Sequence, residues 1–179
     1  MKRLISLLVL LSVFSMFVIG ISQDAKFKYV GVKKCKMCHK SKKSGNQFGL
    51  WSERKHSKAY ATLATAQSKE VAKKAGVAGD PQKAKECLVC HVTGYGEPAE
   101  ATLTLEEGVS CEACHGPGSE YKSMKVMKDI YAGKVKGADY GLLEQTNELC
   151  VKCHNPKSPT YKEFKFEEAL KVIAHPVPK

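Results

Sequence analysis

The sequence has 179 residues, of which 29 are Lys or Arg and 18 are Asp or Glu, so its formal net charge is +11. It also contains eight cysteines and six histidines. The patterns of a Ser-His-Asp triad, a phosphate-binding loop and a nucleic-acid-binding motif are absent from it, which argues against a hydrolase, a nucleotide-binding protein and a gene regulator.

The chain begins with a segment typical of a secretory signal. Lys2 and Arg3 precede an uncharged, apolar run over residues 4–22. Small residues at the end of this run favour cleavage after Ser22, which gives a signal peptide over residues 1–22 and a mature chain over residues 23–179. The alternative is an uncleaved anchor, because the run is just long enough to cross a bilayer. No second run of that length follows, so we expect no membrane span after signal removal.

The motif Cys-x-x-Cys-His occurs four times and uses every cysteine. Two thiols about one helical turn apart can reach the two vinyl groups of one haem, and the next residue can then place its imidazole on the iron. Zinc is the main alternative, but it requires no histidine at that offset, and a thioredoxin-like dithiol requires only one such pair. The pattern therefore predicts four covalently attached c-type haems. The attaching cysteines are Cys35, Cys38, Cys87, Cys90, Cys111, Cys114, Cys150 and Cys153, and the iron ligands are His39, His91, His115 and His154.

Four haems leave little chain for an ordinary apolar core. The mature chain has 157 residues, or about 39 per haem, so the haems themselves are expected to form the core. This predicts one domain with a mainly α, compact multihaem cytochrome c fold and little β structure, which cannot fold properly without its cofactors.

The basic charge is weak evidence for a nucleic-acid or membrane partner. Signal removal lowers the formal charge to +9, and four haems bring about eight propionates, so the loaded protein is expected to be near neutral. The paired lysines at 33–34, 42–43 and 73–74 are interpreted as solvated faces and propionate partners.

The expected elements follow in chain order. Residues 27–32 form an extended lead-in, and a first attachment helix ends near residues 44–46. Residues 47–75 form one long helix or two in series, which Gly76 and residues 79–81 stop. After the second motif come a loop at 94–98 and a small strand at 102–105. One stripe of the long helix carries His56, Tyr60, Leu63 and Gln67.

Only 20 residues separate Cys90 from Cys111, so the second and third haems are expected to be close neighbours. Residues 119–131 then predict a helix, glycines mark a looser stretch before the fourth motif, and residues 163–174 predict an amphipathic helix that delivers His175 just before a proline. The helix over 119–131 carries Tyr121, Met124 and Met127.

Two histidines remain as candidates for the sixth iron positions. These are His56 and His175, for which the alternative is a surface or packing role; bis-histidine ligation would give low-potential electron carriers. At least two irons must then use another ligand or stay open. Met124 and Met127 lie three apart on one helical face, and methionine ligation raises the potential of a haem. Their alternative role is to fill gaps in the core.

The chain resembles the tetrahaem cytochrome c-554 family over nearly the whole mature sequence. The resemblance rests on "GVKKC", "WSERKHSKAYATL", "CLVCHVTGYG", "GVSCEACHGPG" and "FKFEEALKVIAH". It implies that His56 is the distal ligand of the third haem, opposite His115, and that His175 serves the fourth, opposite His154. In the family the second haem, here next to His91, typically lacks a protein sixth ligand.

One departure from the family affects the first haem. The family type has a further histidine about ten residues beyond the third motif, and the present sequence has none there. Met124, Met127 or Tyr121 could take that place, or the first iron could be open as well. The redox ordering of the family therefore does not carry over.

The sequence thus predicts a periplasmic or otherwise exported electron carrier rather than an enzyme. Its expected partners are redox proteins, namely a quinol- or substrate-oxidising donor and a terminal acceptor. No general acid or base is required, and Glu97 and Glu112 are expected to face solvent or pair with lysine. The alternatives are an enzyme that acts on nitric oxide or hydroxylamine at an open haem, and a subunit of an extended haem-conducting assembly.

Overall fold

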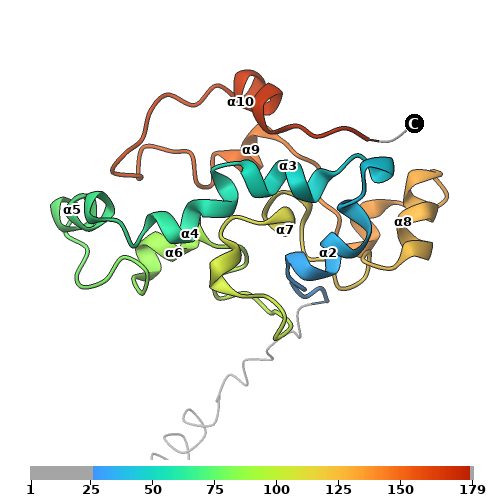
Figure 1. Ribbon diagram of the computed structural model, residues 1–179, viewed down its shortest axis with the longest axis horizontal. Coiled ribbons are helices and arrows are strands. Elements are labelled where there is room, and N and C mark those ends of the chain that lie inside the picture. The colour runs from blue at the N-terminus through green and yellow to red at the C-terminus, as the bar shows by residue number, and fades with distance from the viewer. Residues whose placement is uncertain (1–25, 178–179) are drawn as a thin grey trace, which may run out of the picture.

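The computed structural model describes residues 26–177. The predicted signal peptide over residues 1–22 lies outside the described residues, so the division of the chain at residue 22 remains a prediction. The described residues form helices joined by turns, with one isolated parallel bridge between Tyr29 and Ala99. The expected mainly α fold with little β structure is therefore confirmed (Figure 1).

In the first half of the chain the predicted long helix is broken into short pieces. Arg54 takes an extended conformation and ends the first piece. Thr65 is also extended, and its side chain accepts a hydrogen bond from the Ser68 amide, so it caps a new helix. The first attachment helix also ends earlier than expected, at His39. The helices here are α2 (Val32–His39), η1 (Lys42–Ser44), α3 (Gln47–Glu53), η2 (His56–Lys58), α4 (Ala59–Thr62) and α5 (Ala66–Lys74).

In the second half the strand predicted at residues 102–105 is wrong, because the backbone turns there into a 3-10 helix that begins at Leu105. The helix predicted over 119–131 starts later, where Ser123 caps it. The final amphipathic helix is confirmed in a shorter form. The helices here are α6 (Lys85–His91), η3 (Leu105–Glu107), α7 (Cys111–His115), α8 (Met124–Tyr131), η4 (Gly137–Tyr140), α9 (Asn147–Cys150) and α10 (Phe166–Ile173).

The elements extend along one direction, with α5 and α8 at opposite ends of the long axis and α2, α3 and α7 between them (Figure 1). A glycine closes the turn after α7: Gly116 has a φ of 80°, and a Cβ on it would lie 2.2 Å from the Gly141 carbonyl oxygen. This close approach brings the segment after η4 against the third motif.

The apolar core of the described residues is small. Its main cluster consists of Leu63, Leu88 and Val92, with Tyr60 and Cys87 packed against it. The other buried apolar side chains are Val30, Val32, Ala72, Ala84 and Tyr121. A chain of this length needs more buried apolar surface than this to fold, which fits a fold that cofactors complete.

Candidate haem-binding centre

The four motifs lie on short helices. The first three occupy α2, α6 and α7, and the fourth starts at the last residue of α9. There the amide of His154 still bonds to the Cys150 carbonyl at 3.0 Å, so the helical turn continues through the motif. All eight cysteines are free thiols, of which Cys38 is exposed and the other seven are half-buried. Each motif therefore presents its two thiols about one helical turn apart, as haem attachment requires.

The thiols of different motifs meet in two places. The thiols of Cys35 in the first motif and Cys111 in the third are close enough to interact, and this interaction, followed by burial, raises the pKa of the Cys35 thiol. Cys153 of the fourth motif contacts Cys90 of the second, and burial is the main cause that raises the pKa of Cys153 to about 12. The structure thus joins motif one to motif three and motif two to motif four.

Backbone hydrogen bonds also link the segments that flank motifs two and three, whereas the closeness of the second and third haems stays a prediction. The amide of Thr93, two residues after the second motif, donates to the Gly108 carbonyl at 3.0 Å. The amide of Ser110, just before the third motif, donates to the Thr93 hydroxyl at 2.7 Å. These bonds hold the two motif helices to a common buried segment.

Each of the two spare histidines faces a motif histidine. The ring centroids of His56 and His154 are 6.0 Å apart, and those of His175 and His115 are 5.8 Å apart. A metal–imidazole bond is about 2 Å long, and a ring centroid lies roughly 1 Å beyond the nitrogen, so two imidazoles on one ion have centroids about 6 Å apart. Both pairs therefore have the spacing of a bis-histidine site.

This pairing differs from the one that the family resemblance implied. His56 was expected opposite His115, and His175 opposite His154, but the structure places them with the other partners. The sequence could not settle this because each spare histidine is more than 20 residues from both candidate motif histidines. Which pair meets depends on how α3, η2 and α10 cross the motif helices.

Burial keeps these imidazoles neutral. It is the main cause that lowers the pKa of His115 to about 4, with further lowering from His175 and His39. Burial also lowers the pKa values of His56, His154 and His175. Neutral imidazole is the form that binds a metal, so at neutral pH these side chains are ready to act as ligands.

Hydrogen bonds orient the other motif histidines. His91 Nδ1 lies 2.8 Å from the Ala59 carbonyl oxygen, and donation there leaves Nε2 free for a metal. His39 Nδ1 lies 3.4 Å from Gln47 Oε1. His175 Nδ1 is buried and has no hydrogen-bond partner among the described residues.

The candidate methionines lie on α8, away from any such pairing. Met124 is 63% exposed, and Met127 is half-buried. The hydroxyl of Tyr121 donates to the Gly116 carbonyl oxygen at 2.6 Å, so it is already occupied. Ligation by Met124 or Met127 remains a prediction.

Glu112 was expected to face solvent or to pair with a lysine, and this expectation was wrong. It is 1% exposed. Its carboxylate accepts hydrogen bonds from the amides of Val30 (2.9 and 3.1 Å), Gly31 (2.7 Å) and Gly118 (2.7 Å). An acid in the first turn of a helix is a favourable pattern, but two of its partners, Val30 and Gly31, lie 82 and 81 positions earlier in the chain, beyond the reach of any local signal. Glu112 therefore fastens the lead-in of the first motif to the third.

A second buried acid lies beside it. Glu107 is 8% exposed, and its Oε2 accepts a hydrogen bond from the Val32 amide at 2.8 Å. Its Oε1 is buried without a partner among the described residues. Burial is the main cause that raises the pKa of Glu107, with Glu112 adding to it. No local pattern marks Glu107 as buried, because its partner is a backbone amide 75 positions earlier in the chain.

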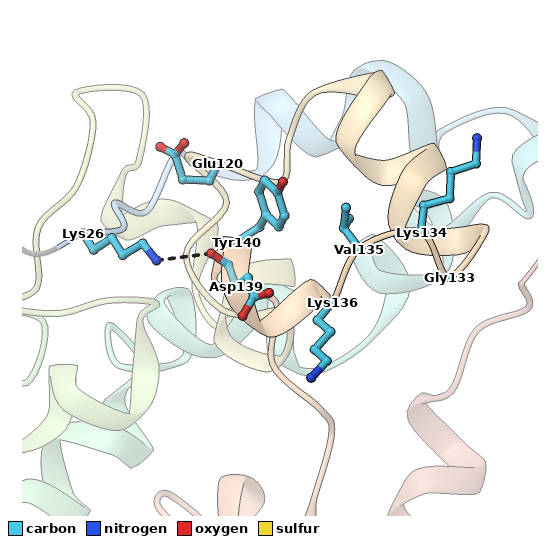
Figure 2. A pocket seen from close by; sticks show the side chains of 8 residues that line it. All are labelled: Lys26, Glu120, Gly133, Lys134, Val135, Lys136, Asp139 and Tyr140. Carbon is cyan, nitrogen blue, oxygen red and sulfur yellow. Dashed lines mark hydrogen bonds between the residues drawn. The ribbon is translucent and has the colours of Figure 1, made fainter.

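One large pocket in the described part of the chain contains no motif residue. It measures about 1150 Å³, and Figure 2 shows Lys26 reaching across it to the Asp139 carbonyl oxygen, at 3.4 Å. Its walls come from the lead-in, η4 and the turn after α8.

Among the helices of residues 26–177, none has both the length and the apolar character that a membrane span requires.

The residues present fit covalently bound haem. Paired thiols on helical turns, neutral imidazoles at ligand spacing, a buried imidazole nitrogen without a partner and a small apolar core all agree with it.

Comparisons with known proteins agree with this chemistry. The profile of the family described as "Cytochrome c554 and c-prime" matches residues 34–116. Cytochrome c-554 of Nitrosomonas europaea is 36% identical over 109 residues, which cover 58% of this chain and 43% of that relative. The match thus spans less than half of the relative's length. A solved structure of reduced cytochrome c554 from Nitrosomonas europaea superimposes with a TM-score of 0.59 and 29% identity, covering 81% of this chain and 82% of the other.

Proposed function

Because this chain belongs to the cytochrome c-554 family, whose members bind c-type haem covalently, we propose that it is a tetrahaem electron-transfer protein. Bound haem supplies a one-electron iron couple whose potential the axial ligands set. The observation that carries the proposal is that four Cys-x-x-Cys-His turns are folded against one another, with thiols of different motifs in contact.

The side chains have separate roles in this proposal. The eight cysteines form thioether bonds, and His39, His91, His115 and His154 each supply one axial nitrogen. His56 and His175 supply the second axial nitrogen to the irons of the fourth and third motifs, respectively. The ring distances of 6.0 and 5.8 Å support this assignment. Bis-histidine ligation favours low-potential, six-coordinate carriers.

We infer export to the periplasm or beyond from the amino-terminal signal pattern and from the membership of a c-type cytochrome family. The partners are an oxidising enzyme that donates electrons and a terminal acceptor. Electron transfer needs no acid or base catalyst, and the buried carboxylates serve here to hold the motif helices in place.

Mass spectrometry and low-temperature electron paramagnetic resonance test the proposal. We expect four haems on each chain and two low-spin bis-histidine signals. His56→Ala and His175→Ala should each convert one low-spin signal to high spin, whereas Lys73→Ala should change neither. A chain with fewer than four haems, or variants that leave both signals intact, would contradict the proposed sites.

A second function is favoured by the histidine count. The six histidines of the sequence supply two facing pairs, which leaves His39 and His91 without a partner imidazole. The irons of the first and second motifs would then bind small diatomic ligands. We expect the reduced protein to take up two equivalents of carbon monoxide. Uptake of none would exclude this function, and catalytic consumption of nitric oxide would establish it.

A further inference from the structure

The first attachment motif lies in the most basic stretch of the chain. Between residues 25 and 52 there are eight lysines and no acidic residue. The ten residues on either side of each of the other motifs include acids, so their surroundings have mixed charge. These acids are Asp80, Glu86, Glu97 and Glu100 around the second motif, Glu106, Glu107 and Glu120 around the third, and Glu144, Glu148 and Glu163 around the fourth.

The fold gathers part of this charge on one surface, which we call the basic face. It consists of Lys36, Met37, Lys40, Lys42 and Lys43, on α2 and η1 and the turn between them, and all five side chains are exposed. Met37, the apolar member of the set, is 70% exposed. The motif cysteine next to it, Cys38, is the exposed one of the eight.

The charge of the basic face is not neutralised from within the described part of the chain. The ion pairs there involve Lys122, Lys125, Lys134 and Lys165, and no lysine of the basic face. Lys36 instead lies over the Phe48 ring, 4.8 Å from its centroid.

The buried acids nearest to the first motif are hydrogen-bonded to the backbone and not to the lysines of the basic face. Glu112 and Glu107 bond to the backbone amides of residues 30–32, directly before α2. Glu100 is paired with Lys122 at 2.6 Å. The acids close to the first motif therefore hold the backbone or another lysine, and no carboxylate side chain of the described residues is paired with a lysine of the basic face.

We propose that the basic face is the docking surface through which an acidic redox protein exchanges electrons with the first haem, an inference that rests on the proposed tetrahaem function. A cluster of one sign of charge steers an oppositely charged partner and raises association rates about 10- to 1,000-fold. The exposed Met37 adds an apolar contact among the charged side chains, and methionine is enriched in protein interfaces. Electron-transfer complexes have small interfaces and are transient. Five side chains beside an attachment site are therefore enough to orient such a partner.

The test compares two charge-reversal variants of the haem-loaded protein. The first carries Lys40→Glu, Lys42→Glu and Lys43→Glu on the basic face. The control carries Lys69→Glu, Lys73→Glu and Lys74→Glu on α5, which are also exposed and change the net charge equally. The donors are reduced plant-type ferredoxin, an acidic protein, and reduced lumiflavin, a small reductant without net charge. One electron passes from the ferredoxin cluster to a ferric haem, and stopped-flow absorbance follows the second-order rate.

With ferredoxin at about 20 mM ionic strength we expect the basic-face variant to react at least about tenfold more slowly than wild type. The control should slow by less than about threefold, and the difference should vanish near 500 mM, where screening is strong. Lumiflavin should reduce all three proteins at one rate. If the reversed variant does not retain its haems, Lys40→Gln, Lys42→Gln and Lys43→Gln replace it, with an expected loss of at least about threefold.

Other outcomes would overturn the proposal. Equal slowing of both variants would show an effect of net charge alone. Slowing with lumiflavin as well would show that the lysines act on the haem itself. Unchanged ferredoxin rates, with loss of binding to vesicles of anionic phospholipid, would assign the face to a membrane surface. A wild-type chain without four haems would contradict the proposed function, whereas a wild-type tetrahaem protein whose ferredoxin rate ignores salt would contradict the docking surface alone.

Discussion

At the scale of single residues, Glu112 joins two parts of the chain that the sequence separates. A carboxylate can only accept hydrogen bonds, and this one is surrounded by amide donors from the lead-in and from the turn after the third motif. The bonds fix the start of α2 relative to α7, and thereby the first attachment site relative to the third.

Glu112→Gln should therefore be strongly destabilising. The new amide group would face a backbone donor in a buried site, and an unsatisfied buried group costs about 1–3 kcal/mol. We expect a loss of about 3 kcal/mol in the free energy of unfolding, measured on the haem-loaded protein by urea titration of Trp51 fluorescence. The exposed Glu148 gives the matched control, since Glu148→Gln should leave the urea midpoint nearly unchanged. Equal effects of the two changes would show that the buried bonds do not support the fold.

Glu107 should make stability depend on pH in the opposite sense to an ordinary carboxylate. Burial raises its pKa in the folded state, so the folded chain binds the proton more tightly than the unfolded chain. Its contribution to the free energy of unfolding is fully present below the pKa that Glu107 has in the unfolded chain. This contribution is lost as the pH rises through the higher pKa of the folded chain. Glu107→Gln should therefore be more stable than wild type at pH 7, and this gain should disappear near pH 4.

Urea midpoints at the two pH values measure this effect. Glu106→Gln is the control, because it removes the same charge from an exposed side chain whose pKa is lowered by hydrogen bonds to its own backbone and to Thr104. A gain at pH 7 in the control, or none in Glu107→Gln, would count against the role of burial.

These residues also show how far the sequence predicts the site. The attaching cysteines and the proximal histidines follow from a local pattern, because haem attachment uses neighbours in the chain. Glu112 and Glu107 do not, because their partners are backbone amides far away in sequence. The partners of His56 and His175 also lie far away in sequence, and for them the ring contacts differ from the pairing that the family resemblance implied.

At the scale of elements, Gln47 at the start of α3 links three segments. Its Nε2 donates to the Ser44 carbonyl oxygen of η1 and, at 2.9 Å, to the carbonyl oxygen of Pro176. Its Oε1 faces His39. The bond to Pro176 ties the tail after α10, and with it His175, to the first attachment region.

Gln47→Ala should loosen that tail. Loss of one hydrogen bond is worth about 1 kcal/mol, or about a fivefold change in an opening equilibrium. We expect amide hydrogen exchange in the peptide that contains residues 174–177 to accelerate about fivefold. Gln67→Ala, on the exposed side of α5, should leave that peptide unchanged. Protection that persists in Gln47→Ala would mean that the tail is held by other contacts.

The extent of the helices was the least predictable part of the fold. Apolar spacing over residues 47–75 suits a continuous helix, but Thr65 competes with it by capping a new one. The last residue of the expected stripe, Gln67, is consequently exposed. The alternation at residues 102–105 has no neighbouring strand to pair with among the described residues, so a turn forms instead.

At the scale of the whole molecule, the small apolar core makes folding depend on the cofactors. The main buried cluster of the described residues has three side chains, too few to offset the conformational entropy of the chain. We expect the chain produced without haem attachment to lose most of its helical signal in far-ultraviolet circular dichroism. A haem-free chain with the helicity of the loaded protein would contradict this dependence.

The contact between Cys35 and Cys111 has a consequence for biogenesis. Both thiols are free until a haem occupies them, and exchange with a disulfide of another protein, which is reduced to its dithiol, would join them into a crosslink that blocks two attachment sites at once. With the export proposed above, Cys35 emerges before Cys111, so the hazard begins only when the third motif arrives. Attachment of haem to Cys35 before Cys111 arrives removes this hazard. Attachment of haem to Cys90 before Cys153 arrives does the same for the second and fourth motifs. The folded arrangement therefore favours maturation that proceeds from the amino terminus under reducing protection.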